Sequence, residues 1–416
     1  FYDLFQLNMN LIRCTLEQLN MIVPLIKKYL LLTGICLICF TFSVFSQNKS
    51  AAINTNGSSA LTTAAPFLLI APDARGGAMG DNGVATSGDV NSMHWNPAKY
   101  AFAPGDNAIG ISYTPWLRRL TNDINLGYVS GYKKLDQNQT LAGSFRYFSY
   151  GDIIYTDEQG NNYGQVTPSE FSVDLAYIRK LTDNFSIALA GRFIHSNIGQ
   201  SSSDNSLMPG NAGAADIAIY YKKDGRLFGT NTTTSYGVNI SNIGTKMDYG
   251  TGNKSFLPTN LRIGAGENFH LDESSSFAVN LDVNKLLVPT NPIRDQNGNI
   301  VKGMNPNVSV PAGIFQSFYD APGGGKEELQ ELSYALGMEY NYNQQFFLRS
   351  GYFYENPNKG NRRYLTLGAG VKFNIFNLDF SYLVSQKQNP LSNTLRFSLN
   401  FYFGNKISGD AGHEEK

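Results

Sequence analysis

Apolar and polar side chains alternate along most of the chain beyond residue 106. In the last such stretch Leu395, Phe397 and Phe401 share one face of an extended strand, and Arg396 and Ser398 share the other. Successive side chains of a strand point to opposite faces of the sheet. In a membrane barrel the apolar face meets lipid and the polar face lines the lumen, whereas a soluble sandwich buries its apolar face. One strand does not separate these cases, so the rest of the chain must decide.

The same alternation recurs many times. Phe277, Val279 and Leu281 share one face of an expected strand, and Asn280 and Asp282 share the other. Counting segments of this kind gives about fourteen expected strands. They are residues 107–116, 122–133, 140–150, 170–181, 185–198, 212–223, 233–243, 259–271, 275–286, 332–342, 345–355, 363–373, 376–386 and 394–403.

The lengths of the connections favour a membrane barrel. Bacterial barrels have short periplasmic turns and longer extracellular loops. Connections after even-numbered strands are mostly short, with 224–232 as an exception, and the long connections all follow odd-numbered strands. The short ones are 135–139, 182–184, 272–274 and 343–344, and the long ones are 151–169, 199–211, 244–258 and 287–331. We therefore expect an all-β fold, a transmembrane antiparallel β-barrel of about 14 strands with an N-terminal hatch or plug segment in the lumen.

The N-terminal part has the features of an export signal. A short basic start at Lys27 and Lys28 precedes an apolar run, and a small residue stands at Ser46. We interpret 21–46 as a signal peptide, with a transmembrane anchor as the alternative, and 1–20 as an upstream artefact. The expected organisation is then completed by a hatch or plug at 47–106, a barrel at 107–403 and a polar periplasmic tail at 404–416.

Composition narrows the possible functions. The chain has 33 basic and 33 acidic residues, and this balance argues against a nucleic-acid partner. Its cysteines, Cys14, Cys36 and Cys39, precede the expected cleavage site, so the mature chain is expected to lack disulfides and thiolate metal sites. The four histidines are scattered without ligand spacing. No motif points to catalysis, and we expect neither an enzyme nor a cofactor.

The polar faces of the expected strands carry charges of both signs. A structural network of paired ions inside a filled barrel is the simpler interpretation, and a substrate path is the alternative. The candidate lumen residues are Asp174, Arg192, Arg262, Asp282, Glu339, Lys372 and Arg396. Inward-facing glycines, such as Gly237 and Gly368, leave room for another part of the chain to approach closely.

Residues 47–106 contain few strand-like patterns and many small residues. The candidate hatch motif comprises Arg75, Met79, Gly80, Trp95, Asn96 and Pro97. This Ala-Arg, Met-Gly and Trp-Asn-Pro-Ala run before fourteen expected strands resembles the FadL-like outer-membrane family, in which the segment forms a hatch inside the barrel. Within that family, the segments 71–80 and 94–98 and the Tyr-Thr-Pro-Trp-Leu sequence at 113–117 resemble the PorV family of type IX secretion. The likeness extends over about 60–403.

The resemblance implies a function that composition does not show. PorV-like proteins associate with a giant translocon barrel (SprA or Sov) and accept cargo by its C-terminal domain. They deliver the cargo to the surface sortase PorU, with PorQ and PorZ. Outer-membrane lipid is the other expected contact. The alternative is a FadL-like transporter of hydrophobic small molecules, and a third hypothesis is a surface lipid hydrolase with a site assembled from separate strands.

Two loop regions are candidates for binding a partner or cargo. The connection 287–331 is too long for a simple turn and carries the apolar residues Ile314, Phe315, Phe318 and Tyr319. These side chains either fold back over the barrel mouth or dock on a partner. Trp116 and Leu117 form the second candidate, for which an interfacial anchor in the membrane is the simpler interpretation.

Overall fold

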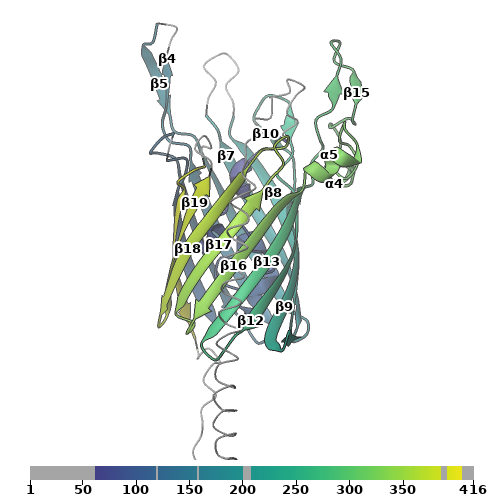
Figure 1. Cartoon of the computed structure of the whole chain (residues 1–416). Helices are drawn as coiled ribbons and strands as arrows, with labels where there is room; N and C mark the ends of the chain where they lie inside the picture. Colours follow the sequence, from purple (N-terminus) through teal and green to yellow (C-terminus); the bar gives the residue numbers. More distant parts are fainter. Residues whose placement is uncertain (1–60, 119, 157–158, 200–207, 386–390, 405–416) are drawn as a thin grey trace, which may run out of the picture. The chain divides into compact units, whose positions relative to one another are not determined.

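Fourteen antiparallel strands form one closed barrel in the computed structural model, which describes residues 61–118, 120–156, 159–199, 208–385 and 391–404 (Figure 1). Each barrel strand pairs with the next along the chain, and the last pairs with the first. The strands are β1 (Asn107–Pro115), β2 (Asn125–Lys134), β3 (Gln139–Ser149), β6 (Ser169–Lys180), β7 (Phe185–Asn197), β8 (Gly210–Leu227), β9 (Thr230–Gly244), β12 (Asn260–His270), β13 (Ser275–Leu286), β16 (Ser333–Tyr342), β17 (Phe346–Tyr354), β18 (Arg363–Phe373), β19 (Phe376–Ser385) and β20 (Leu395–Phe403).

The predicted fold class is confirmed. The barrel closes where β1 pairs with β20, with Ile111 opposite Leu399 and Ser112 opposite Ser398. Closure leaves no strand edge with unpaired backbone groups, which is what a sheet inside lipid requires. No helix among the described residues is both long and apolar enough to cross a membrane.

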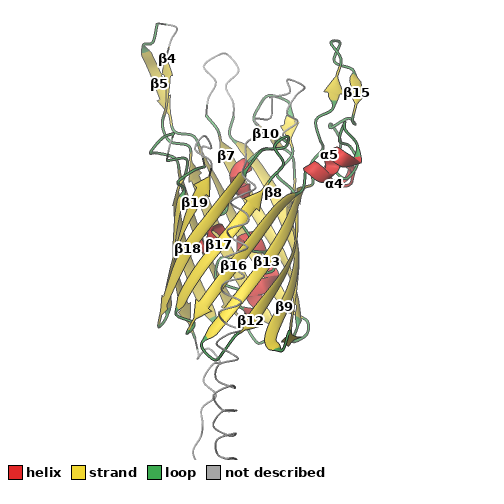
Figure 2. Ribbon diagram, in the orientation of Figure 1, coloured by secondary structure: helices red, strands yellow, loops and turns green. Residues whose placement is uncertain are grey.

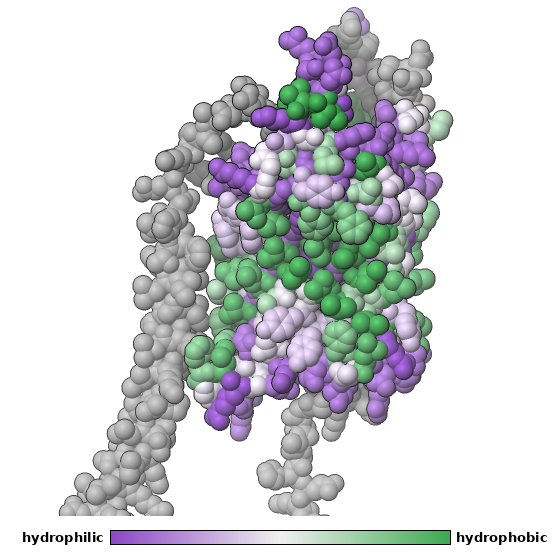
Figure 3. Space-filling view, turned by 90° about the vertical axis from the view of Figure 1, so that its right-hand side faces the viewer, coloured by the Kyte–Doolittle hydropathy of each residue, from purple (hydrophilic) through white to green (hydrophobic). Residues whose placement is uncertain are grey.

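The two faces of the wall differ as the sequence pattern predicts. On β6 the outward Leu175 is 71% exposed, whereas the neighbouring inward Asp174 is buried. The same alternation runs along the other strands, and the outward side chains form the green belt of Figure 3. An apolar belt flanked by polar rims is the surface expected of a protein embedded in a bilayer.

The hairpin of β8 and β9 differs from the expectation. The sequence predicts a loop at 224–232, but β8 continues to Leu227 and β9 begins at Thr230, so only Phe228 and Gly229 connect them. Positive φ angles of 51° and 79° at these two residues form the tight turn. The exception in the pattern of connection lengths therefore disappears.

All short connections now lie at one end of the barrel, which we call the turn end, and the longer connections lie at the other, the loop end. Short two-stranded sheets and helices extend the loops (Figure 1). They are β4 (Ile153–Thr156) with β5 (Asn162–Val166), β10 (Met247–Asp248) with β11 (Lys254–Ser255), β14 (Ile293–Arg294) with β15 (Ile300–Lys302), and the helices α4 (Val310–Gln316) and α5 (Gly325–Gln330). By the rule for bacterial barrels, the loop end faces the cell exterior and the turn end the periplasm.

Residues 61–106, which we call the lumenal segment, lie inside the barrel. Backbone N–H groups of this segment donate to inward side chains on separate strands: Ala74 to Ser398 on β20, Gly80 to Thr366 on β18 and Gly83 to Asp282 on β13. Only a position inside a closed barrel permits contacts with so many strands. The segment contains η1 (Pro66–Leu69), α2 (Ala74–Ala78), α3 (Ser92–Trp95) and η2 (Pro97–Phe102), the red helices within the barrel of Figure 2.

Apolar clusters attach both ends of the lumenal segment to the wall. Toward the loop end Phe67 and Leu68 pack with Leu126, Ile194 and other buried residues. Toward the turn end a second cluster joins the segment to β1, β2, β3, β6, β7 and β8, and it contains Val90, Met93, Ala98, Tyr100, Ala103, Ala108, Tyr132, Ala142, Ala176, Ile178, Ala188, Ala190, Ala218 and Tyr220. One half of the wall is thus packed tightly against the segment.

Several predicted segments lie outside the described residues. These are the upstream 1–20, the signal peptide 21–46, the first part of the hatch at 47–60 and the tail beyond Gly404. The predicted cleavage site and the predicted boundaries of the hatch stay predictions.

Candidate functional site

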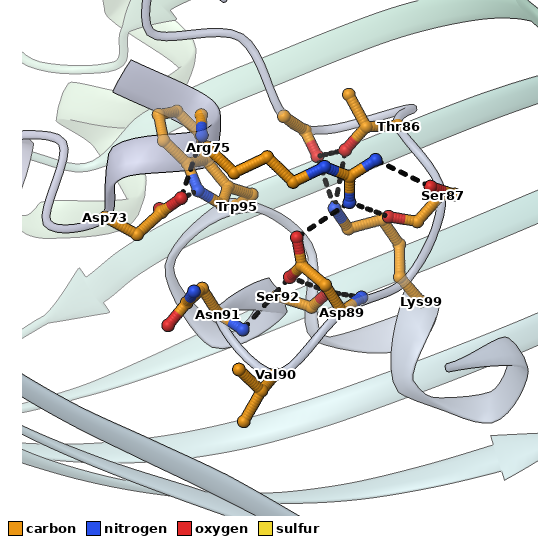
Figure 4. A network of polar contacts seen from close by, with 12 residues as sticks. Asp73, Arg75, Thr86, Ser87, Asp89, Val90, Asn91, Ser92, Trp95 and Lys99 are labelled. Carbon is orange, nitrogen blue, oxygen red and sulfur yellow. Dashed lines mark hydrogen bonds and ion pairs between the residues drawn. The ribbon is translucent and has the colours of Figure 1, made fainter. Parts of the chain in front are cut away.

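Trp95 is the centre of the lumenal segment. Its indole Nε1 donates to Asp73 Oδ1 at 2.7 Å, and Asp73 Oδ2 accepts from the backbone N–H of Gly76 at the start of α2 (Figure 4). Gly76 and Gly83 lie against the two rings of the indole, where a Cβ would overlap its atoms. Both glycines are therefore required by the close approach of the ring.

Arg75 connects the lumenal segment to the barrel wall. Its guanidinium donates to Glu339 on β16 at 2.8 and 3.0 Å. It also donates to Asp89 and Ser87 within the segment (Figure 4). Glu339 also accepts from Arg349 on β17 at 2.6 Å. A guanidinium presents donors in a fixed fork, so two carboxylates and a hydroxyl fix both its position and its orientation.

The other residues of the candidate hatch motif make packing contacts and hydrogen bonds within the protein. Gly80 has φ of 74° and its N–H donates to Thr366 at 2.8 Å. Met79 is buried. The Asn96 oxygen accepts from Ala98 N–H at the start of η2, where Pro97 occupies the first position. The Asn96 amide nitrogen donates to backbone oxygens of Val84 and Ile219, which ties the segment to β8.

The predicted lumen charges form separate groups. On one wall Arg192 of β7 pairs with Asp174 of β6 and, at 3.1 Å, with Asp216 of β8. On the opposite wall the buried guanidinium of Arg396 lies 3.4 Å from Asp81 of the lumenal segment. These pairs lie in a filled lumen, which is what a structural network predicts.

Arg262 and Asp282 bind the lumenal segment rather than each other. The Arg262 guanidinium donates to the backbone oxygen of His94 at 2.6 Å and lies over the Trp95 ring. Asp282 accepts from the N–H groups of Gly83 and Val84 at 2.7 and 2.9 Å.

His94 stands between Arg262 and a second arginine, Arg146, which lies 2.8 Å from its Nδ1. Burial, and then the charges of these two arginines, hold the pKa of His94 well below its ordinary value, so it stays neutral at physiological pH.

At the loop end, the connection 287–332 is a folded unit that we call the rim appendage. It lies beside the outer wall next to the loop end of β13 (Figure 1). Lys285, an outward residue of β13, donates to Glu328 at 2.9 Å and to Glu331 at 2.8 Å. Lys359, from the loop between β17 and β18, pairs with Glu327 at 2.6 Å and with Glu331 at 3.0 Å. Two lysines and three glutamates thus clamp the appendage to two separate hairpins.

Hydrogen bonds within the appendage complete this clamp. Thr290 donates its hydroxyl to Glu331 and its N–H to Asp320, and Ala321 N–H donates to Glu328. Burial alone would raise the pKa of Glu331, but hydrogen bonds from Lys285 and Thr290 and the lysine charge outweigh it and lower that pKa. Glu331 therefore stays ionised in its buried position.

The predicted partner-binding residues of this loop lie on the appendage. Phe315 is 71% exposed, Tyr319 63% and Phe318 48%, whereas Ile314 is half-buried. Leu329 of α5, 68% exposed, adds a further large apolar side chain. The contact of Gly313 with Phe256, from the connection between β9 and β12, packs α4 against a second loop. The three exposed aromatic side chains are thus held on a fixed support rather than on a free loop.

Trp116 and Leu117 are placed differently. Trp116 packs beside the buried cluster of Phe67, Leu68 and Leu126. Its backbone N–H donates to the backbone oxygen of Ile124. Leu117, with φ of 51°, begins the following turn and is half-buried. The structure separates these two residues from the aromatic face of the appendage, so they do not join it in one surface.

Sequence reasoning missed the ion clamp. Lys285 is the signal that could have revealed it, because it follows Phe277, Val279, Leu281 and Val283 on the outward face of β13. A charge on a lipid-facing position is costly unless something covers it. The glutamates that pair with Lys285 are distant in sequence and follow no spacing rule.

Comparison with known proteins identifies a family. The model of "Type IX secretion system protein PorV" matches residues 53–293, which is more than half of the chain. No curated protein matches the chain.

Among solved structures, the toluene transporter TodX of Pseudomonas putida is 12% identical, with 78% of this chain and 95% of that chain covered and a TM-score of 0.44. The toluene transporter TbuX of Ralstonia pickettii is 10% identical, with coverages of 81% and 100% and a TM-score of 0.43. A FadL homologue of Pseudomonas aeruginosa is 10% identical, with coverages of 80% and 99% and a TM-score of 0.38.

The barrel indicates in which membrane the protein lies, and the family match indicates the secretion system to which it belongs. A closed barrel with an apolar outer belt and a polar, filled lumen is an integral protein of the outer membrane. The match over 53–293 covers the lumenal segment and the strands from β1 to β13. The chain therefore belongs to the PorV family of type IX secretion system proteins.

Proposed function

We propose that this protein binds the C-terminal domains of secreted cargo at the translocon and carries them to the attachment complex at the cell surface. Membership of the PorV family supports a role in type IX secretion. The observation that carries the proposal is the exposed aromatic face of Phe315, Phe318 and Tyr319 on the clamped rim appendage. It acts as a binding platform and catalyses no reaction.

The clamp makes this face suitable for recognition. Binding through a mobile loop would cost the entropy of ordering that loop, and a preformed surface avoids most of this cost. Aromatic side chains bury large areas with few rotatable bonds, which is why they are enriched in the energetic centres of interfaces. Polar residues of the same appendage, including Ser309 and Lys326, are exposed to solvent.

The partners follow from the proposed route. A giant translocon barrel of the SprA or Sov type would meet this protein in the plane of the membrane and pass cargo to it. The sortase PorU, with PorQ and PorZ, would receive the cargo. Lipid would cover the remaining outward belt, which includes Ile111 and Leu175. Trp116 and Leu117 would contribute through the packing of the loop end.

The alternative function, transport of hydrophobic small molecules, requires an apolar path through the lumen. The inward faces carry Asp174, Arg192 and Glu339, which are paired with charges of opposite sign. Moving an apolar solute from water to a place beside such paired charges gains little free energy, because the charges keep their own polar partners. These observations favour the shuttle over the transporter.

A pull-down from the native envelope tests the proposal. A tagged protein with Phe315→Ser, Phe318→Ser and Tyr319→Ser would be compared with the wild type in mild detergent, followed by proteomics. We expect the wild type to recover a very large barrel and secreted proteins sharing one C-terminal domain, and the triple variant to recover at least tenfold less cargo. The matched control is Ile300→Ser with Val301→Ser, two exposed apolar residues in β15 of the same appendage.

Two results would contradict the proposal. Equal cargo recovery by the triple variant would exclude the aromatic face as the cargo site. Recovery of the barrel alone, together with a stoichiometric fatty acid or other apolar molecule detected by mass spectrometry, would favour the transporter.

A further inference from the structure

Basic pairs mark the turn end on one half of the barrel. They are Lys133–Lys134 at the end of β2, Arg179–Lys180 at the end of β6 and Lys222–Lys223 in β8. The β8 pair lies level with the turn between β6 and β7, because the Lys222 N–H donates to the backbone oxygen of Asn184 at 2.8 Å. Successive side chains of a strand alternate, so each pair places one cation toward the lumen and one toward the outside.

The inward cations have partners within the protein. The Lys180 and Lys222 ammonium groups lie 6.0 and 4.9 Å from the centre of the Phe102 ring. Lys134 donates to the backbone oxygen of Ala103 at 2.6 Å. These contacts attach the end of the lumenal segment to the wall, which gives the inward lysines a structural role.

The outward cations, Lys133, Arg179 and Lys223, form what we call the cation row. Lys133 stands opposite Leu141 of β3 and Arg179 opposite Ile187 of β7, and both of these neighbours are exposed on the outer wall. Lys133 and Lys223 are exposed, and Arg179 is half-buried. None of the three cations has a carboxylate within ion-pair distance among the residues that the structure describes.

No acidic side chain balances the cation row on the outer wall. The outward residues of the described barrel strands from β1 to β9 include no aspartate or glutamate. In the adjoining turns, Asp136 accepts from the backbone N–H of Asn138 at 2.7 Å, and Asp183 pairs with the inward Lys180 at 2.9 Å. The Arg179 charge acts on Asp136 from a distance, without an ion pair. This part of the outer wall therefore carries a net positive charge.

Apolar side chains continue the surface from the cation row toward the middle of the wall. Tyr177 is the next outward residue of β6, and its hydroxyl donates to the amide oxygen of Gln139 at 2.7 Å. Leu141 of β3, Leu189 of β7 and Ile217 of β8 lie in line with Tyr177 across the sheet, and all are exposed. An aromatic ring with a polar tip at the edge of an apolar surface is typical of a membrane interface.

The other half of the turn end has a different character. Its outward residues beside the turns are aromatic and exposed, namely Tyr342, Phe346, Phe373, Phe376 and Phe403. Aromatic girdles of this kind occur at both membrane interfaces of bacterial barrels. The cation row is therefore a local feature of the wall from β2 to β8 rather than a property of the whole rim.

The geometry of the cation row suits a phosphate group with attached acyl chains. β3 separates β2 from β6, and β7 separates β6 from β8, so neighbouring cations stand about 10 Å apart across the sheet. Arg179, in the middle, presents a planar fork that matches phosphate oxygens, and the two lysines add point charges on flexible stems. A free anion would contact only the cations, whereas the chains of a phospholipid would also cover Leu141 and Leu189.

We propose that the cation row binds the headgroup of an anionic phospholipid in the periplasmic leaflet of the membrane. The phosphate lies on Arg179 and a flanking lysine, and the acyl chains lie along the apolar side chains beside Tyr177. The rim appendage is at the opposite end of the barrel, so this site is independent of the cargo function proposed above.

Lipid titration followed by native mass spectrometry tests the proposal. The protein, delipidated in an uncharged detergent, would be titrated with phosphatidylglycerol or with zwitterionic phosphatidylcholine of the same acyl chains. We expect the wild type to bind phosphatidylglycerol about tenfold more tightly or better, since each cation near a membrane surface strengthens binding to anionic lipid about fivefold. Added salt should reduce this preference, because charges exposed to solvent are screened.

The test variant removes the cation row by Lys133→Gln, Arg179→Gln and Lys223→Gln. We expect it to bind the two lipids equally. The matched control makes the same change in net charge at three exposed lysines of the loop end, Lys254→Gln, Lys302→Gln and Lys326→Gln. The control should keep the preference of the wild type. Unchanged thermal unfolding of both variants shows that the barrel is folded.

Three outcomes would overturn the proposal. Equal binding of the two lipids by the wild type would mean that the cation row does not select an anionic lipid. A preference that survives in the test variant would place the lipid elsewhere. Complete displacement of phosphatidylglycerol by inorganic phosphate would mean that the site takes a free anion. The cargo pull-down would be unaffected by any of these outcomes.

Discussion

At the scale of single residues, glycines decide how closely the lumenal segment approaches the wall. A Cβ on Gly351 of β17 would overlap the backbone of Met79, and one on Gly237 of β9 would overlap that of Val84. Backbone cannot move aside as a flexible side chain can, so each glycine is needed for the packing of the filled lumen. Gly191 of β7 differs, because nothing lies within 4 Å of the position of its Cβ.

Gly351→Ala should destabilise the protein, and Gly191→Ala should not. The first substitution forces the lumenal segment away from β17, at a cost of about 1–3 kcal/mol, whereas the second adds a methyl group in open space. Chemical unfolding in detergent, followed by the fluorescence of Trp95 and Trp116, measures the difference. Equal stability of the two variants would mean that the lumenal segment does not pack against β17 as described.

At the scale of elements, an ion clamp decides where the rim appendage is held. Lys285 and Lys359 reach the appendage from two hairpins, and Glu331 receives both ammonium groups. The side chain of Glu331 is 0% exposed, so the loss of either partner leaves a buried charge with less compensation. Such a cluster holds the appendage in one position more strictly than an uncharged contact of similar size would.

Lys285→Met should release the appendage without unfolding the barrel. Removing one member of a buried pair costs about 3–5 kcal/mol, and here that cost is confined to 287–332. Limited proteolysis should therefore cleave this region of the variant much faster than that of the wild type. Lys180→Met is the control, because its partner Asp183 is 95% exposed and the pair contributes little. Slow cleavage of the Lys285 variant would show that other contacts hold the appendage.

The clamp should also weaken in acid. The pKa of folded Glu331 lies below its ordinary value of 4.5, so its contribution is complete above that value and is lost as the pH falls through the lower folded pKa. Amide hydrogen exchange at 310–330, corrected for intrinsic rates, should show full protection at pH 7 and reduced protection near pH 3. Glu331→Gln should exchange quickly at both pH values. Equal protection of the wild type at both pH values would contradict the assignment of Glu331 as an ionised clamp.

At the scale of the whole molecule, the barrel reverses the usual distribution of polarity. Outward positions such as Leu175 and Leu189 are apolar and exposed, while inward charges such as Asp174 and Arg192 are buried and paired. Lipid favours the first arrangement, and pairing between neighbouring strands or with the lumenal segment makes the second possible.

Leu175→Arg should destabilise the protein in a bilayer. Arginine at the lipid-facing midplane of a barrel costs about 2–4 kcal/mol, and Leu175 lies midway along β6. Urea unfolding in phospholipid vesicles measures this cost. The control is Leu120→Arg, because Leu120 is 67% exposed in the connection after β1, outside the barrel strands, and little change is expected. A neutral Leu175 variant would argue against lipid contact on that face.

The sequence by itself determined the barrel. Period-2 alternation places every second residue on one face, and this local rule holds along each strand, so the predicted strands match those of the structure closely. Connection lengths then predict the orientation, with the loop end toward the cell exterior. The loop predicted at 224–232 was wrong, because its residues continue the pleat of β8 and β9 although their polarity no longer alternates.

Only the tertiary structure decided the partners of the charged side chains. Lys285 with Glu331, Arg75 with Glu339, and Asp282 with the N–H groups of Gly83 and Val84 come together through closure of the barrel and insertion of the lumenal segment. Sequence pattern reports which face a residue occupies, but not which residue stands opposite across the lumen or over the rim. That choice depends on strand register and on side-chain geometry, which long-range packing fixes.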